Sequence, residues 1–240
     1  MTDILSDDLA ECAHTIEATF AALFGGIEEW RRELESYIAH AEGTIGTDEL
    51  DDLVERLVIP ALSGPRSLMI GAGFVAAPGF LADSPWHLAW WLGHANTFGV
   101  GSAQPSVRRL IAEEDPGADT FRDYTALEWW RVPSETGARH ITGPYVDYLC
   151  TDDYTLTLTM PVTFAGSMVG VVGADLYVDH VERALLPAVN SVSGRTTLIN
   201  VAGRVVVSTD PHRATGTILR SDDGGRRLPV GDTSLLLVLE

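Results

Sequence analysis

Aromatic rings and carboxylates gathered in one central segment give this sequence its clearest chemical signal. The rings are Trp129, Trp130 and Tyr145, and the acids are Asp147 and Asp175. Aromatic side chains cost little entropy to order and attract a cation over their faces, and a buried carboxylate needs a donor or an opposite charge. Together these groups could hold an ammonium ion. The rings could equally be core residues, with the acids satisfied inside the fold.

The segment that carries Asp175 has the pattern of a β-hairpin. From Tyr154 to Met160, apolar residues alternate with threonines, which is the period of a strand with one buried and one polar face. A turn at residues 164–167 leads into a second, valine-rich run at 168–178 that contains the acid. A site built on these residues would therefore rest on an antiparallel sheet.

Two helices are expected ahead of the sheet. Apolar residues recur every three or four positions from Leu9 to Tyr37, and a second helical pattern covers residues 47–60. The pair Gly25-Gly26 could kink the first helix or divide it. The apolar stripe suits the interface of a homodimer formed through the N-terminal helices, and it suits packing against the chain's own domain at least as well.

The remaining patterns predict strands at residues 67–75, 107–111, 196–200, 204–209 and 234–240, and a short helix at 121–131. They indicate an α+β fold, an antiparallel sheet with flanking helices, preceded by long N-terminal helices and followed by a small β appendage. We expect three parts: a helical region at 1–62, a ligand-binding domain at 63–190 and a β-hairpin appendage at 191–240.

The composition limits the kinds of partner and of chemistry that this protein can have. The net charge is −18, and all sixteen basic residues are arginine, which argues against a nucleic-acid partner and excludes lysine chemistry. The sequence has no apolar run long enough to cross a membrane, and its first residues lack the features of a signal peptide, so we expect a cytoplasmic protein without a membrane partner. The seven histidines show no metal-ligand spacing, and no catalytic motif occurs. We therefore expect no metal, no cofactor and no enzymatic activity.

Four motifs together resemble the Cache superfamily of PAS-like sensor domains, over about residues 67–210. They are Tyr124 to Trp130, Gly143 to Asp147, Tyr154 to Val162 and Gly170 to Asp175. The resemblance implies a long N-terminal helix that leads into an antiparallel sheet flanked by helices, and a role in sensing small molecules. It also implies that an output domain or a separate regulator protein receives the signal.

The amino-acid-binding branch of this superfamily has a pattern of Tyr, Arg-x-Trp-Tyr, Tyr and Asp. By resemblance, Tyr124, Trp129, Tyr145 and Asp175 fall on it, and Trp130 takes the place of its second aromatic residue. The arginine of the pattern, which clamps a ligand carboxylate, is Leu127 here, so Arg131 or Arg122 would have to replace it. With Asp147 as a second acid, the residues favour a cationic amine slightly over an amino acid.

The leading hypothesis is a non-enzymatic sensor that binds an amine or amino acid and relays its occupancy to a regulator or across a dimer. Its ligand-binding residues would be Tyr124 near the rim of the site, Trp129, Trp130, Arg131, Tyr145, Asp147 and Asp175. One alternative is a hydrolase or isomerase that uses His94 or His140 with an acid. Another is an interaction module without a ligand, in which Trp129 packs solidly against Tyr145.

Overall fold

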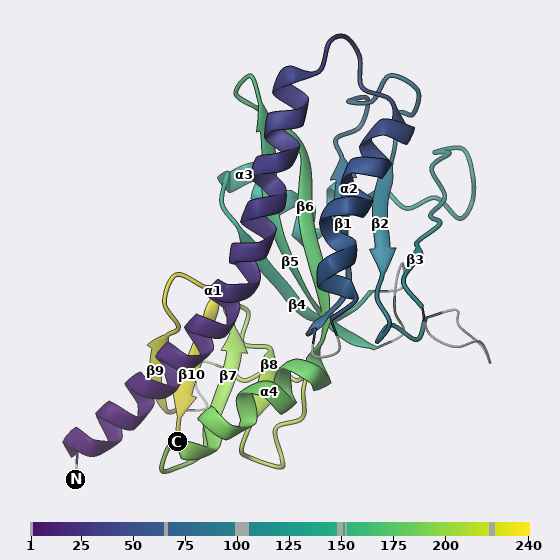
Figure 1. Cartoon of the computed structure of the whole chain (residues 1–240). Helices are drawn as coiled ribbons and strands as arrows, with labels where there is room; N and C mark the ends of the chain where they lie inside the picture. Colours follow the sequence, from purple (N-terminus) through teal and green to yellow (C-terminus); the bar gives the residue numbers. More distant parts are fainter. Residues whose placement is uncertain (1, 65–66, 99–105, 148–150, 152, 221–223) are drawn as a thin grey trace.

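The fold consists of two antiparallel sheets joined by helices (Figure 1). The computed structural model describes residues 2–64, 67–98, 106–147, 151, 153–220 and 224–240. The strand order is β3-β2-β1-β6-β5-β4 in the larger sheet and β8-β7-β10-β9 in the smaller one. The predicted α+β class, with long N-terminal helices and an antiparallel sheet, is confirmed.

The helices are α1 (Thr2–His40), α2 (Thr47–Leu62), the 3₁₀ turn η1 (Tyr124–Ala126), α3 (Glu128–Thr136) and α4 (Val178–Ser191). The strands are β1 (Met69–Ala76), β2 (Leu88–Leu92), β3 (Arg108–Arg109), β4 (His140–Val146), β5 (Tyr154–Phe164), β6 (Ser167–Tyr177), β7 (Thr196–Asn200), β8 (Val205–Ser208), β9 (Arg226–Pro229) and β10 (Leu235–Leu239).

Helix α1 runs along both sheets as one uninterrupted element (Figure 1). The helix continues through Gly25 and Gly26 and is not divided there. Phe24 and Ile27 on either side of the glycines are buried in the core, and this packing stabilises the helix at that point. A side chain at either glycine would meet nothing within 4 Å, so the glycines lie on the open side of the helix. The buried stripe of α1 packs inside its own chain, and the predicted homodimer stays a prediction.

The predicted hairpin is the centre of the larger sheet. Strands β5 and β6 pair along their whole length, and Ala165 and Gly166 between them both have positive φ, as a two-residue primed turn requires. Strand β5 has the predicted apolar and polar faces, and both of them are buried. Leu156 and Leu158 pack into the core shared with α1, but Thr157 and Thr159 on the other face are buried as well.

The C-terminal part is larger than the predicted hairpin. Strands β7 and β8 pair as expected, and β10 joins them, but β9 arises at residues 226–229, where no strand was predicted. Strand β9 pairs with the free edge of β10. All five residues of β10 are apolar, so that strand presents apolar side chains on both faces of the sheet. Helix α4 leads from β6 into this sheet. The division of the chain at residues 62 and 190 stays a proposal.

Candidate functional site

The register of the central strands brings Gly71, Asp175 and Thr157 into one row. Gly71 of β1 pairs with Asp175 of β6, and Asp175 pairs with Thr157 of β5. A Cβ atom at Gly71 would lie 2.8 Å from Trp90 Nε1 and 3.4 Å from Asp175 Oδ2, so only glycine lets the indole of Trp90 lie against β1 beside this acid. The row gives one polar patch on the inner face of the sheet.

A small cavity, here called the acid cavity, borders this patch. Its volume is about 30 Å³. Asp147, Thr157 and Asp175 form its polar wall, and the rest consists of Trp90, Trp129, Val75, Leu88 and Leu110. A cavity needs about 10–15 Å³ to hold one water molecule, so this space fits a group of the size of water or of an ammonium ion, and no larger metabolite.

The two acids of the acid cavity are linked through two hydroxyl groups. Tyr145 Oη lies 3.2 Å from Asp147 Oδ2 and 2.8 Å from Thr157 Oγ1, and Thr157 Oγ1 donates to Asp175 Oδ1 at 2.7 Å. Each hydroxyl carries a single hydrogen, so two hydrogens serve these three contacts. A carboxylate oxygen accepts more than one hydrogen bond, so a cationic group with several N–H donors can join these contacts.

Burial makes this arrangement costly. Asp175 is 2% exposed and Asp147 is 9% exposed. A carboxylate taken out of water needs strong compensation. The cavity wall also carries donors: the indole N–H groups of Trp90 and Trp129 are buried and have no hydrogen-bond partner among the described residues. The wall of the acid cavity thus combines buried indole N–H donors with carboxylates.

Tyr124 and Trp130 pack against Trp129 and do not line the acid cavity. The prediction that Tyr124 lies near the rim is wrong: its side chain is fully buried, its hydroxyl donates to Ala76 O at 2.7 Å, and burial raises its pKa above the ordinary value. Its ring stacks at 6.1 Å on Trp129 and lies 5.3 Å from Trp130. Trp130 is buried in the same aromatic cluster and does not line the acid cavity.

Arg131 lies away from both acids. Its guanidinium is about half exposed and pairs with Glu135 one turn further along α3. Helix α3 directs Trp129 and Trp130 inward, and the next residue consequently faces water. Arg122 bonds the carbonyls of Asp119 and Phe121 on an exposed loop. Neither arginine borders the acid cavity, so the structure offers no replacement at Leu127 from these two residues.

A second space, here called the junction cavity, lies where the two sheets meet. Its volume is about 240 Å³. Leu127, Glu128 and Trp129 of α3 form one wall, residues 142–145 of β4 form another, and Asn200, Ala202 and Arg204 of the β7–β8 turn form the third. Trp129 lines both cavities, and Tyr145 lines this one while its hydroxyl reaches Asp147. Trp129 and Tyr145 thus border a common space, and Tyr145 also packs against the aromatic cluster that contains Trp129.

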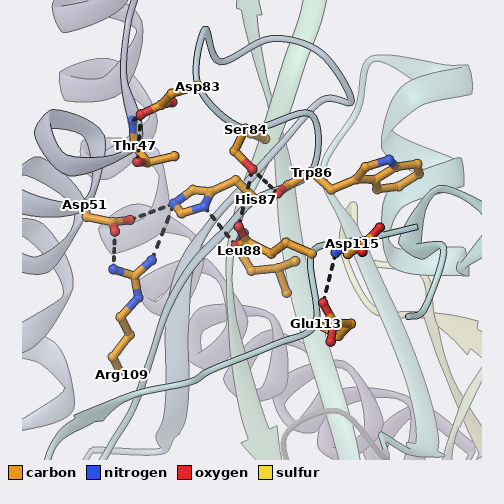
Figure 2. Close-up of polar contacts among 12 residues, drawn as sticks. Thr47, Asp51, Asp83, Ser84, Trp86, His87, Leu88, Arg109, Glu113 and Asp115 are labelled. Atoms are coloured by element: carbon orange, nitrogen blue, oxygen red, sulfur yellow. Dashed lines mark hydrogen bonds and ion pairs between the residues drawn. The ribbon is translucent and has the colours of Figure 1, made fainter. Parts of the chain in front are cut away.

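A different polar cluster joins α2 to the other side of the sheet (Figure 2). His87 Nε2 lies 2.9 Å from Asp51 Oδ1, and His87 Nδ1 lies 2.8 Å from Glu114 Oε1. Arg109 bonds Asp51 and its guanidinium lies 5.6 Å from the Trp91 ring. Burial lowers the pKa of His87, but hydrogen bonds and charges from Asp51 and Glu114 outweigh it and raise that pKa. His87 lies just before β2.

Sequence reasoning missed Trp90 and Thr157 and, in the junction cavity, Thr142 and Arg204. Thr157 carried a usable signal, because a threonine face opposite a leucine face on a central strand must meet something polar inside the fold. Gly71 carried another, since a glycine inside a strand marks a close approach. Arg204 gave no such signal, because only the packing of the second sheet brings it to Trp129.

The comparisons relate this fold to sensor domains of the PDC type. Residues 110–183 match the family model of the methyl-accepting chemotaxis protein-like first PDC sensor domain. This confirms the predicted resemblance, and it agrees with the prediction of a non-enzymatic protein because the matched family consists of sensor domains. No curated protein sequence matches the chain.

Solved structures share this fold over nearly the whole chain. A structure called methyl-accepting chemotaxis protein X is 14% identical with a TM-score of 0.66, and the match covers 99% of this chain and 96% of that one. The ligand-binding domain of the Pseudomonas fluorescens chemoreceptor CtaA, in complex with L-valine, is 15% identical with a TM-score of 0.64 over 99% and 95%. The corresponding domain of the Pseudomonas aeruginosa amino acid chemoreceptor PctC, in complex with GABA, is 15% identical with a TM-score of 0.58 over 99% and 97%.

Proposed function

We propose that this sensor domain binds a small primary amine or amino acid, with the ammonium group in the acid cavity between Asp147 and Asp175. One observation carries the proposal: two buried carboxylates border a cavity of the size of an ammonium group. The ammonium would donate to both acids and lie against the indole of Trp129. The CtaA and PctC domains, which share the fold, are described as complexes with L-valine and GABA.

The proposed binding residues are Trp129, Tyr145, Asp147 and Asp175, together with Trp90 and Thr157. Tyr124 and Trp130 act through Trp129 by fixing its ring. Arg131 has no part in this site, since its side chain pairs with Glu135 in solvent. Because the acid cavity holds only the ammonium, the rest of the ligand must lie beyond Trp129 or displace it, and binding is then coupled to the position of α3.

The signal would be relayed to a partner protein or across a dimer, as predicted from the sequence. Within the part of the chain that the structure describes, none of the helices has both the length and the apolar character needed to span a bilayer. The predicted cytoplasmic location is not supported by the comparisons and stays a prediction.

A thermal-shift screen of the whole chain tests the proposal. Primary amines and amino acids should raise the melting temperature at saturation, because they bind only the folded state, and simple carboxylates should not. Asp175→Asn should abolish the shift, and Asp179→Asn, an exposed acid at the start of α4, should retain it. A screen in which no ammonium compound stabilises the chain, or in which both variants respond alike, would refute it.

The enzyme alternative receives no support from the geometry. Among the described residues, no histidine lines the acid cavity or the junction cavity. His140 does meet an acid, with its Nε2 2.8 Å from Glu128 Oε1, and this hydrogen bond lowers the pKa of Glu128. That pair connects β4 to the first turn of α3, and it is explained as a structural contact.

A further inference from the structure

Arg204 brings a positive charge to the junction cavity from the second sheet. Its backbone N–H donates to Asn200 Oδ1 at 2.9 Å, and its Nη1 donates to Gly216 O at 2.7 Å, so the side chain is held in place. A guanidinium has five N–H donors, and Gly216 O is its only hydrogen-bond acceptor among the described residues. Donors therefore remain for an acceptor inside the cavity.

Two further donors border the same space. Thr142 is 5% exposed, and its hydroxyl has no hydrogen-bond partner among the described residues. The indole N–H of Trp129 is unpartnered in the same sense, and Trp129 lines both cavities. Buried polar atoms are almost always paired, so two unpaired donors beside one arginine indicate that an acceptor binds here.

The one acid of the junction cavity is already engaged. Glu128 borders the cavity, and His140 Nε2 contacts its Oε1 at 2.8 Å. That hydrogen bond is the main cause that lowers the pKa of Glu128, and the charge of Arg204 contributes to the same shift. On the α3 side of the cavity, the carboxylate of Glu128 is thus hydrogen-bonded to His140. On the β7–β8 side, the guanidinium of Arg204 has N–H donors beyond the one that bonds Gly216 O.

We propose that the junction cavity binds the carboxylate end of the ligand, with Arg204, Thr142 and Trp129 as its donors. The inference rests on the proposed function, because it assumes that the ammonium group occupies the acid cavity. Trp129 lines both cavities, so a ligand that extends past this indole would carry its charges at opposite ends of a short chain. Arg204 would then do the work of the arginine that Leu127 replaces.

This arrangement would also connect the two sheets through the ligand. Asn200 Nδ2 already donates to Gly143 O at 2.7 Å, which attaches the β7–β8 turn to β4. A carboxylate bound by Arg204 would add a second link at the same place. The occupied domain would consequently hold its sheets more firmly together than the empty one.

The test compares γ-aminobutyrate with butylamine, which has the same ammonium and chain but no carboxylate. Binding of each to the whole chain is measured by calorimetry for the unchanged protein and for Arg204→Gln, which keeps a donor for Gly216 O. The unchanged protein should prefer γ-aminobutyrate by at least about tenfold, and Arg204→Gln should remove that preference with butylamine affinity retained. Thr142→Val should reduce the preference less, and Arg183→Gln on α4 should leave it unchanged.

Equal affinity for the two probes in the unchanged protein would overturn the inference, as would an Arg204→Gln variant that loses affinity for both probes equally. Where Arg204→Gln does not fold, the Thr142→Val result decides in the same way. Failure of the proposed function has a different signature: butylamine affinity would be unaffected by Asp175→Asn. If neither probe binds, both proposals are wrong.

Discussion

Two buried polar clusters on the larger sheet differ in how their carboxylates are balanced. Asp51 lies against cations of the chain itself, namely Arg109 and His87 (Figure 2). Glu114 contacts the other nitrogen of that histidine. Asp147 and Asp175 contact hydroxyl groups and border a cavity. We therefore expect the first cluster to stabilise the fold, and the second is the proposed ammonium site.

The first prediction concerns the cluster with its own cations. Asp51→Asn should lower the free energy of unfolding by about 3 kcal/mol, because it leaves His87 and Arg109 facing a neutral amide in a buried position. Urea denaturation measures the change. Asp52→Asn, an exposed neighbour on α2, is the control and should cost less than about 0.5 kcal/mol. Equal losses of unfolding free energy in the two variants would show that this cluster does not stabilise the fold.

The second prediction applies the same substitution to the cavity. Asp175→Asn should weaken amine binding by about 100-fold, which corresponds to roughly 2.7 kcal/mol, because it removes one of the charges that hold the ammonium. Its unliganded stability should change by less than about 1 kcal/mol, since Thr157 can still donate to the amide oxygen. A stability loss as large as that of Asp51→Asn would mean that the two clusters are alike.

The comparison also shows what a sequence can predict about a buried acid. The alternation in β5 and the valine run of β6 predicted the hairpin, and the acid inside that run marked Asp175 as a candidate. Which groups meet it depends on strand register, which sets Gly71, Asp175 and Thr157 side by side and admits Trp90. A pattern with period two shows the face of a residue but not its partner on the next strand.

Helix geometry explains another part of the outcome. The motif from Tyr124 to Arg131 predicted inward-facing rings correctly for Trp129 and Trp130, but it did not show that η1 ends at Ala126 and that α3 begins at Glu128. This break sets the rotation of α3 and turns Arg131 outward. The place of Arg204 in the junction cavity could not be predicted, because this residue comes from the second sheet, 75 positions after Trp129 in the chain.

The third prediction uses pH to distinguish the clusters. The pKa of His87 is raised in the folded state from an ordinary value of 6.5, so its contribution to stability is fully present below pH 6.5. That contribution should be lost as the pH rises through the higher, folded pKa. Urea denaturation across this pH range should show a free energy of unfolding that falls as the pH rises. In the His87→Gln variant this fall should be smaller. A slope unchanged in His87→Gln would show that other groups cause it.

The smallest expected effect on ligand affinity is that of replacing Arg131. This prediction tests whether the outward position of Arg131 on α3 keeps its charge from contributing to binding. Arg131→Ala should change amine and amino acid affinity by less than about twofold, because its guanidinium pairs with Glu135 in solvent, and exposed pairs of this kind contribute about 0.3–0.5 kcal/mol to stability. Calorimetry with γ-aminobutyrate measures the affinity. A tenfold loss would show that α3 rotates on binding and brings Arg131 to the ligand carboxylate. The charge at Arg204 would then be dispensable, and the contrast between a cluster balanced by the chain and a cavity completed by a ligand would have to include the motion of this helix.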